Sequence, residues 1–384
     1  MIDLPVELVS RVVDYLPKID ACSLRLTCKT LASKSFRAFG HNFGHSRTIV
    51  YSPTDLSMFQ TYMRHPDYAP VLRRVTLRVA TIRDFTASSS AFELGTSMSM
   101  VRVGVGNARW SDEYERVFEK ARYTRATIPF EVRQDLKGKI VEDEAVQKGC
   151  IQFFVKSLES VNRLECVEVE YAEYSSNGQL YFRQGAAGAS IYPSPESHDK
   201  IVSALASAGF RCVVAVLSAL KLPVKELVVF AAPSLSDFGG TQPLLSGLLS
   251  SLKYLKSLNL TVLIPKFPAD DVALNDGLAR FIACAPNLEK LHLHFWTKSK
   301  TFQNENTAMF THISSLVHCT NLRDVSLNCI HLEQNDLLAF LKRSKNSLRA
   351  LRLTNVHMRP GSLFELKVAL EDFNLSDREF FCVR

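Results

Sequence analysis

Residues 255–260 read LKSLNL, and the same pattern of apolar residues returns three more times in the second half of the chain. The further copies are 288-LEKLHL-293, 322-LRDVSL-327 and 348-LRALRL-353. Looser copies stand upstream at Leu72/Val75/Leu77, Leu164/Val167/Val169 and Val224/Leu227/Val229. Alternation of apolar and polar residues predicts a short strand with one buried face, so each copy is expected to form such a strand.

Helical stretches separate these strands, at residues 271–284, 306–318 and 332–343. Asn287, Asn321 and Asn346 come just before strand segments, as is typical of a turn from helix to strand. Strand and helix therefore alternate with a period of roughly 20–35 residues, which indicates units that stack on one another. The predicted fold class is α/β with a parallel sheet.

The composition is that of an ordinary soluble globular protein, with 46% apolar and 22% charged residues in 384. The net charge of +7 is spread thinly, and no block of five like charges suggests a nucleic-acid-binding tail. The nine cysteines are odd in number and form no C-x-x-C pair, which favours reduced thiols in the cytoplasm or nucleus. The N-terminus lacks a signal-peptide pattern, and the longest apolar run, residues 212–220, is too short to span a membrane.

The first forty residues form a separate pattern of three short helices. Residues 4–16 predict a helix whose apolar side chains cover an arc of roughly 200°, about twice the stripe that a surface helix needs. A second helix is expected to start at Asp20 as N-cap, with Ile19 and Leu24 forming a hydrophobic staple, and a third covers residues 33–39. So small a unit cannot bury two wide apolar faces alone. It is either a docking module or a cap on the following domain, and the pattern alone supports both.

The residues of this region resemble the F-box family. The matching string is Leu4-Pro5-x-Glu7-Leu8, Val12, Leu16-Pro17, Asp20, Leu24-Arg25-Leu26 and Cys28-Lys29, with departures at Ala21 and Leu31. The resemblance implies docking on the Skp-type adaptor of a cullin–RING ubiquitin ligase. It also implies the residues of that interface: Leu4, Pro5, Leu8, Val12, Leu16, Leu24 and Leu26.

The rest of the chain resembles leucine-rich repeats in their longer, helix-containing form. The match is degenerate, because the Asn or Cys usual after the last strand leucine is replaced by Leu263, Trp296, Ile330 and Val356. The expected architecture is a three-helix F-box over residues 1–40, followed over 46–384 by an irregular, rather flat β/α solenoid with a parallel sheet. We also expect an insertion at about 80–145 and an exposed loop at about 175–197. The alternative is an ordinary parallel α/β sheet.

Together these resemblances predict the substrate-recognition subunit of a Skp–cullin–F-box ubiquitin ligase. The alternative is a repeat-based interaction scaffold that takes no part in ubiquitination. An unknown protein target is expected on the open strand face, where alternation turns polar side chains outward. The residues assigned to it are Asn259, Lys290, His292, His294, Asp324, Asn328 and Arg352, with Glu168, Glu170 and Glu226 as an acidic column upstream.

Catalytic constellations are not recognisable in the sequence. Gly104-x-Gly106 has Arg109 where a dinucleotide-binding loop needs its third glycine, and there is no phosphate-binding loop. His292-x-His294 would share one strand face, yet two ligands do not make a zinc site. We therefore expect a non-catalytic protein with no cofactor and no bound metal. Neither a membrane nor a nucleic acid is an expected partner.

Overall fold

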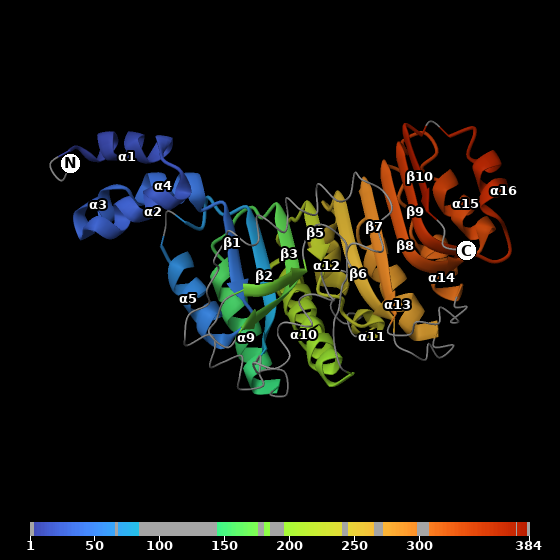
Figure 1. Cartoon of the computed structure of the whole chain (residues 1–384), viewed down its shortest axis with the longest axis horizontal. Helices are drawn as coiled ribbons and strands as arrows, with labels where there is room; N and C mark the ends of the chain where they lie inside the picture. Colours follow the sequence, from blue (N-terminus) through green and yellow to red (C-terminus); the bar gives the residue numbers. More distant parts are fainter. Residues whose placement is uncertain are drawn as a thin grey trace, which may run out of the picture.

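The computed structural model describes residues 4–65, 68–83, 144–175, 180–184, 196–239, 245–264, 272–297, 307–373 and 375–381. All ten described strands belong to one sheet (Figure 1). Nine of its strands stand side by side in the order of the chain and are joined by eight parallel pairings, while the tenth, β4, pairs antiparallel with β3. The strands are β1 Ser46–Val50, β2 Arg74–Arg83, β3 Cys166–Ser175, β4 Leu180–Gln184, β5 Glu226–Val229, β6 Ser257–Ile264, β7 Lys290–Thr297, β8 Asp324–Leu332, β9 Ala350–Met358 and β10 Asp377–Phe381.

The repeated leucines form the buried rows of the sheet. Leu260 of β6 pairs with Leu293 of β7, which pairs with Leu327 of β8 and then Leu353 of β9. All four are essentially inaccessible to solvent. The predicted strands, their parallel pairing and the buried face of the pattern are thus confirmed. The residues that replace the consensus Asn or Cys at 263, 330 and 356 are also buried, and β6, β8 and β9 continue through them.

Helices follow the strands in chain order and form a second layer. Those of the sheet domain are α5 Pro53–Met63, α9 Glu144–Leu158, α10 Glu196–Leu220, α11 Leu235–Gly239, α12 Leu245–Leu252, α13 Val272–Ala283, α14 Ala308–Leu316, α15 Gln334–Lys342 and α16 Leu363–Ala369. Neighbouring pairs along the chain pack on each other, including α9 with α10, α13 with α14 and α14 with α15. The three helices predicted at 271–284, 306–318 and 332–343 are confirmed as α13, α14 and α15, although Leu332 ends β8.

The longest helix, α10, lies against β2 and β3. Its stretch Ser203–Leu220 is long and apolar enough to cross a membrane, and 61% of it is buried inside the fold. Gly209 lets it approach the sheet closely, because a Cβ there would collide with the side chain of Val79. Residues 205–210 and 212–214 are buried on every side of the helix, and this burial in the core accounts for its apolar composition.

Two predicted segments fall largely outside the described residues. Of the insertion expected at 80–145, residues 80–83 end β2 and 144–145 begin α9, and the rest is not described. The loop expected at 175–197 differs from the prediction, because Leu180–Gln184 is strand β4 and Glu196 starts α10.

The N-terminal region contains four helices, so the prediction of three is wrong. They are α1 Val6–Tyr15, α2 Lys18–Thr27, α3 Lys29–Lys34 and α4 Phe36–Phe43. The chain turns between α3 and α4 at Ser35, whose hydroxyl donates to the carbonyl of Leu31 over 2.6 Å. The second helix begins at Lys18 after Pro17, which leaves Asp20 in its first turn rather than at its N-cap. The expected staple is absent for the same reason: Ile19 lies within the helix and is 75% exposed.

Candidate functional site

The N-terminal module, residues 4–43, has a very small core of its own. Its fully buried apolar cluster is Val13, Ala21 and Ala38, against which four half-buried side chains pack. Those four are Leu16, Leu24, Phe39 and Phe43. A cluster of this size covers little of the apolar surface that the four helices carry.

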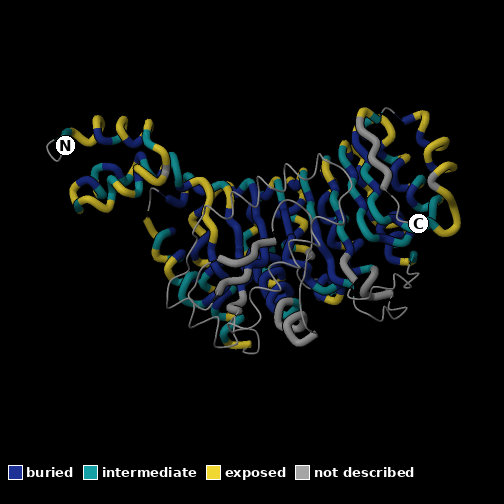
Figure 2. Tube along the Cα trace, in the orientation of Figure 1, coloured by how far each residue is buried: buried dark blue, intermediate teal, exposed yellow. Residues whose placement is uncertain are grey.

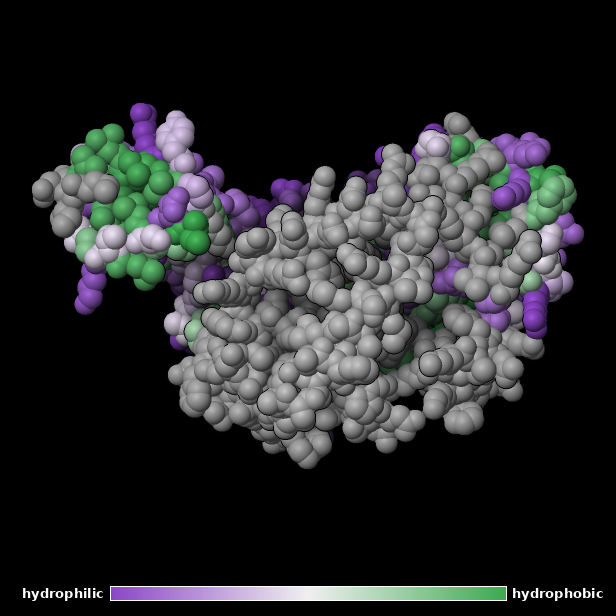
Figure 3. Space-filling view, in the orientation of Figure 1, coloured by the Kyte–Doolittle hydropathy of each residue, from purple (hydrophilic) through white to green (hydrophobic). Residues whose placement is uncertain are grey.

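The remaining apolar side chains of the module face solvent. Figure 2 shows this contrast, with exposed segments along the module and mostly buried strands in the sheet. The described residues include twelve exposed large apolar side chains, and half of them lie within residues 6–26. These six form what we call the apolar docking surface: Val6, Leu8, Val12, Tyr15, Ile19 and Leu26. In the space-filling view the module is mostly hydrophobic on its visible face (Figure 3).

The seven residues assigned to adaptor binding divide into two groups. Pro5, Leu8, Val12 and Leu26 are exposed, and Leu4 is half-buried. Leu16 and Leu24 instead pack on the module's own core.

Sequence reasoning placed Val6 and Tyr15 on the wide apolar arc but did not assign them to the interface, and it missed Ile19. Tyr15 is 88% exposed, more than any of the other five. The arc itself carried the signal for Val6 and Tyr15, because only two of its residues, Val9 and Val13, are buried in α1.

An aromatic cluster joins the module to the sheet domain. The ring of Phe36 in α4 lies 4.0 Å from the ring of His65 and 4.6 Å from that of Tyr68, centroid to centroid. Within the module, the guanidinium of Arg25 lies over the rings of Phe36 and Phe39, 5.1 and 4.6 Å from their centroids. This contact fixes the module at one end of the sheet, where its helices lie beyond β1 (Figure 1).

The polar strand residues at the C-terminal end form rows in register. One row runs Asn259, His292, Ser326 and Arg352 across β6 to β9, and the next runs Thr261, His294, Asn328 and Thr354. Lys290 is exposed, while Asn259, His292, His294, Asp324, Asn328 and Arg352 are half-buried. The prediction that these residues share one face is therefore confirmed, and the face is less open than the alternation alone suggested.

Asp324 ties this face together. Arg352 Nη1 donates to both of its carboxylate oxygens, at 2.9 and 3.1 Å. His292 Nε2 lies 3.3 Å from Oδ1, close enough for an ion pair when protonated but not aligned for a hydrogen bond. Burial acts to raise the pKa of Asp324, yet the contacts from His292 and Arg352 outweigh it and the pKa is lowered. Three assigned residues thus meet at one carboxylate, that of Asp324, which is ion-paired with Arg352.

His294 is the titrating side chain most affected by burial on this face. Desolvation lowers its pKa to about 4, because the charged imidazolium loses its hydration there. The side chain is therefore neutral at physiological pH. The described residues contain no group of three or more His, Cys, Asp and Glu side chains that could hold a metal ion.

The acidic column predicted upstream is not solvated as expected. Glu170 is completely buried, and Arg78 Nε contacts its Oε1 at 2.5 Å from the neighbouring strand. Glu168 is also buried and accepts a hydrogen bond of 3.1 Å from the hydroxyl of Thr76. Glu226 is half-buried beside Arg74, at 3.3 Å. Pairing with cations of β2 neutralises this part of the face, so it presents no acidic patch.

Comparison with known families adds an identification to the geometry of the N-terminal module. The F-box domain model matches residues 1–36. F-box domains bind Skp-type adaptors within cullin–RING ligases, and proteins that carry them are generally non-catalytic substrate receptors. No curated protein matches the sequence closely enough to count as a relative. The chain therefore carries an F-box domain over residues 1–36, which include α1, α2 and α3, and we call the four-helix unit that contains it the F-box module.

Proposed function

We propose that this protein is the substrate-recognition subunit of a Skp–cullin–F-box ubiquitin ligase. The observation that carries the proposal is the apolar docking surface on a module that matches the F-box. Six large apolar side chains exposed within 21 residues are far more than a small domain leaves bare without a partner. The adaptor covers this surface in the complex, and Pro5 and Leu4 extend it at the start of α1.

The sheet domain, residues 46–384, is the target-binding part in this proposal, and we regard it as a leucine-rich-repeat-like solenoid. The support for this reading is a backbone contact that recurs at the start of seven parallel strands, β2, β3 and β5 to β9. The carbonyl of Lys256 accepts the N–H groups of Glu289 and Lys290, and the carbonyl of Glu289 accepts those of Arg323 and Asp324. The same double contact links β1 to β2, β2 to β3, β3 to β5, β5 to β6 and β8 to β9. Such repetition is typical of stacked units.

Co-expression with a Skp-type adaptor tests the proposal directly. Leu8→Asp combined with Pro5→Ala should abolish co-purification, because burying an aspartate at an apolar interface replaces a gain of about 1.5–3 kcal/mol with a desolvation cost. The matched control is Leu249→Asp on α12, since Leu249 is 49% exposed and Leu8 is 46% exposed. Adaptor binding that survives the change in the module, or that is lost equally with the control, would rule out the receptor assignment.

The alternative is a repeat-based scaffold whose N-terminal helices bind some other protein. It also explains the exposed apolar side chains, but not the match to the F-box model. The co-expression experiment separates the two, since a scaffold would not retain the adaptor.

A further inference from the structure

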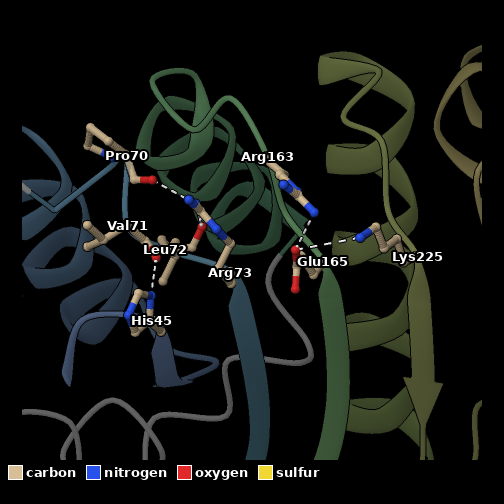
Figure 4. A network of polar contacts seen from close by, with 8 residues as sticks. All are labelled: His45, Pro70, Val71, Leu72, Arg73, Arg163, Glu165 and Lys225. Atoms are coloured by element: carbon tan, nitrogen blue, oxygen red, sulfur yellow. Dashed lines mark hydrogen bonds and ion pairs between the residues drawn. The ribbon is translucent and has the colours of Figure 1, made fainter. Parts of the chain in front are cut away.

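The nine parallel strands of the sheet all begin at one edge, which is the edge that carries the F-box module. This follows from the chain itself, because α4 ends at Phe43, β1 starts at Ser46, and the next eight strands run parallel to β1. Figure 4 shows the first part of this strand-start edge, where Arg163 and Lys225 flank Glu165. Hydrophilic atoms gather along the rim between the module and the C-terminal end of the fold (Figure 3).

From β5 to β9 this edge is strongly basic. We define it as the five segments leading into those strands: 221–226, 253–257, 286–290, 320–324 and 345–350. They hold eight Lys or Arg and three Asp or Glu, a net charge of +5 out of +7 for the whole chain. The cations are Lys221, Lys225, Lys253, Lys256, Lys290, Arg323, Lys345 and Arg349, and all of them are exposed.

Three of these eight cations lack a carboxylate partner within the described part of the chain, while Lys225 pairs with Glu165 at 3.7 Å and Lys345 with Asp372 at 3.7 Å. Glu289 is shared by Lys256 at 2.7 Å and Arg323 at 3.8 Å, and the pKa of Glu289 is lowered mainly by the hydrogen bond from Lys256. Lys253 lies over the ring of Tyr254 at 4.8 Å rather than beside an acid. None of the described carboxylates comes within ion-pair distance of Lys221, Lys253 or Lys290.

We propose that the basic edge from β5 to β9 binds an acidic polypeptide segment of the target. The inference rests on the proposed function, because it takes the sheet domain to be the part that binds the target. Four strand spacings of about 4.8 Å give the edge a length of about 19 Å, which matches roughly six residues of extended chain. Lys290 belongs both to this edge and to the polar strand face, so one target can occupy the two surfaces together.

The pattern of charge favours a peptide over a nucleic acid. Glu226, Glu289 and Asp324 interrupt the cations at β5, β7 and β8. A nucleic acid carries a charge on every unit and would place phosphates against these carboxylates. Successive side chains of an extended peptide point to opposite sides, so only every second one of an acidic peptide faces the edge and these carboxylates can be avoided. The basic edge lies on the same edge of the sheet as the F-box module, so a target bound there lies on the side of the adaptor.

The test is the affinity of the full chain for a labelled octaglutamate peptide, measured by fluorescence anisotropy at low salt, about 50 mM. We expect saturable binding that octaglutamine does not show. Lys253→Glu with Lys290→Glu should weaken it about tenfold or more, since two exposed attractions become repulsions. Lys148→Glu with Arg359→Glu is the control, because it makes the same charge change at exposed positions outside the edge.

Three outcomes would overturn the proposal: no binding of octaglutamate, equal weakening in the control, or tighter binding of an eight-nucleotide single-stranded DNA. Lys253→Gln with Lys290→Gln gives a second, milder variant if the reversal unfolds the protein, and it should also weaken binding. Adaptor co-purification is measured on the same variants. If the variants retain the adaptor and bind octaglutamate as tightly as the wild-type chain does, the basic edge is disproved and the receptor function stands. If the wild-type chain itself does not bind the adaptor, the receptor function is disproved.

Discussion

The two parts of the molecule treat apolar surface in opposite ways. The sheet domain has one continuous hydrophobic core, whose buried residues run from Ile49 to Phe373 along the chain. The F-box module buries five apolar residues, two of them alanines, and leaves six large apolar side chains exposed. A domain that stacks its own units can finish its core, whereas a four-helix unit of about forty residues cannot. We therefore expect the sheet domain to be stable alone and the module to need a partner to cover its apolar surface.

The largest expected effect is on the sheet domain, at the buried pair of Arg78 and Glu170. Arg78→Ala should lower the free energy of unfolding by about 3–5 kcal/mol, because it leaves the buried carboxylate without its cation. Urea denaturation followed by circular dichroism measures this loss. Arg74→Ala is the control, since Arg74 is exposed and its ion pairs are weaker in water. A loss no larger than that of the control would show that Arg78 does not hold the face together.

The next effect is on the pH dependence of the same domain. The pKa of His294 is about 4 in the folded protein and about 6.5 in an unfolded chain, so the unfolded state takes up the proton first. Stability is therefore intact above pH 6.5 and falls as the pH drops from about 6.5 to about 4, by at most about 3 kcal/mol. His294→Asn should remove this part of the acid loss in thermal melts at pH 7 and pH 4.5. His318→Asn, at an exposed site, should retain it.

A smaller effect is expected from removing the module. A chain that starts at His45 should fold, since it keeps the carbonyl that accepts the N–H groups of Arg73 and Arg74. It loses the contact of Phe36 with Tyr68, which is worth about 1–2 kcal/mol of apolar burial. A melting curve as cooperative as that of the full chain is the expected result. Aggregation of the shortened chain alone would mean that the module is a structural cap on the sheet.

The sequence was sufficient to predict the elements that depend on the local spacing of apolar residues. The L-x-x-L pattern fixes which side of each strand is buried, and the spacing of Leu258, Leu291, Val325 and Leu351 puts neighbouring strands in register. The wide apolar arc of residues 4–16 indicated surplus apolar surface, and the F-box itself was identified from the resemblance of the string between Leu4 and Lys29. Both predictions needed only residues that are close together in the chain.

The predictions that failed depended on contacts between distant residues or on competing local signals. Arg78 and Glu170 are 92 residues apart, so their pairing follows from the register of β2 and β3 and not from any pattern near either residue. Asp20 is a good N-cap in isolation, but Pro17 already occupies the N-cap position, and Ile19 lies within the first turn with its side chain exposed. The split of the third helix at Ser35 depends on a hydroxyl that bonds back to the preceding turn.

The central claim is that the exposed apolar side chains of the module serve a partner and not the fold. The most direct measurement compares Leu26→Ser with Leu24→Ala in one titration calorimetry series with purified Skp-type adaptor, alongside thermal melts of the free chains. Leu26 is 86% exposed, whereas Leu24 packs on the module's core. We predict that Leu26→Ser weakens adaptor binding about tenfold or more without changing the melt, since an interface loses about 1.5–3 kcal/mol of apolar burial. Leu24→Ala should instead disturb the module itself. Unchanged adaptor affinity for Leu26→Ser would contradict the account.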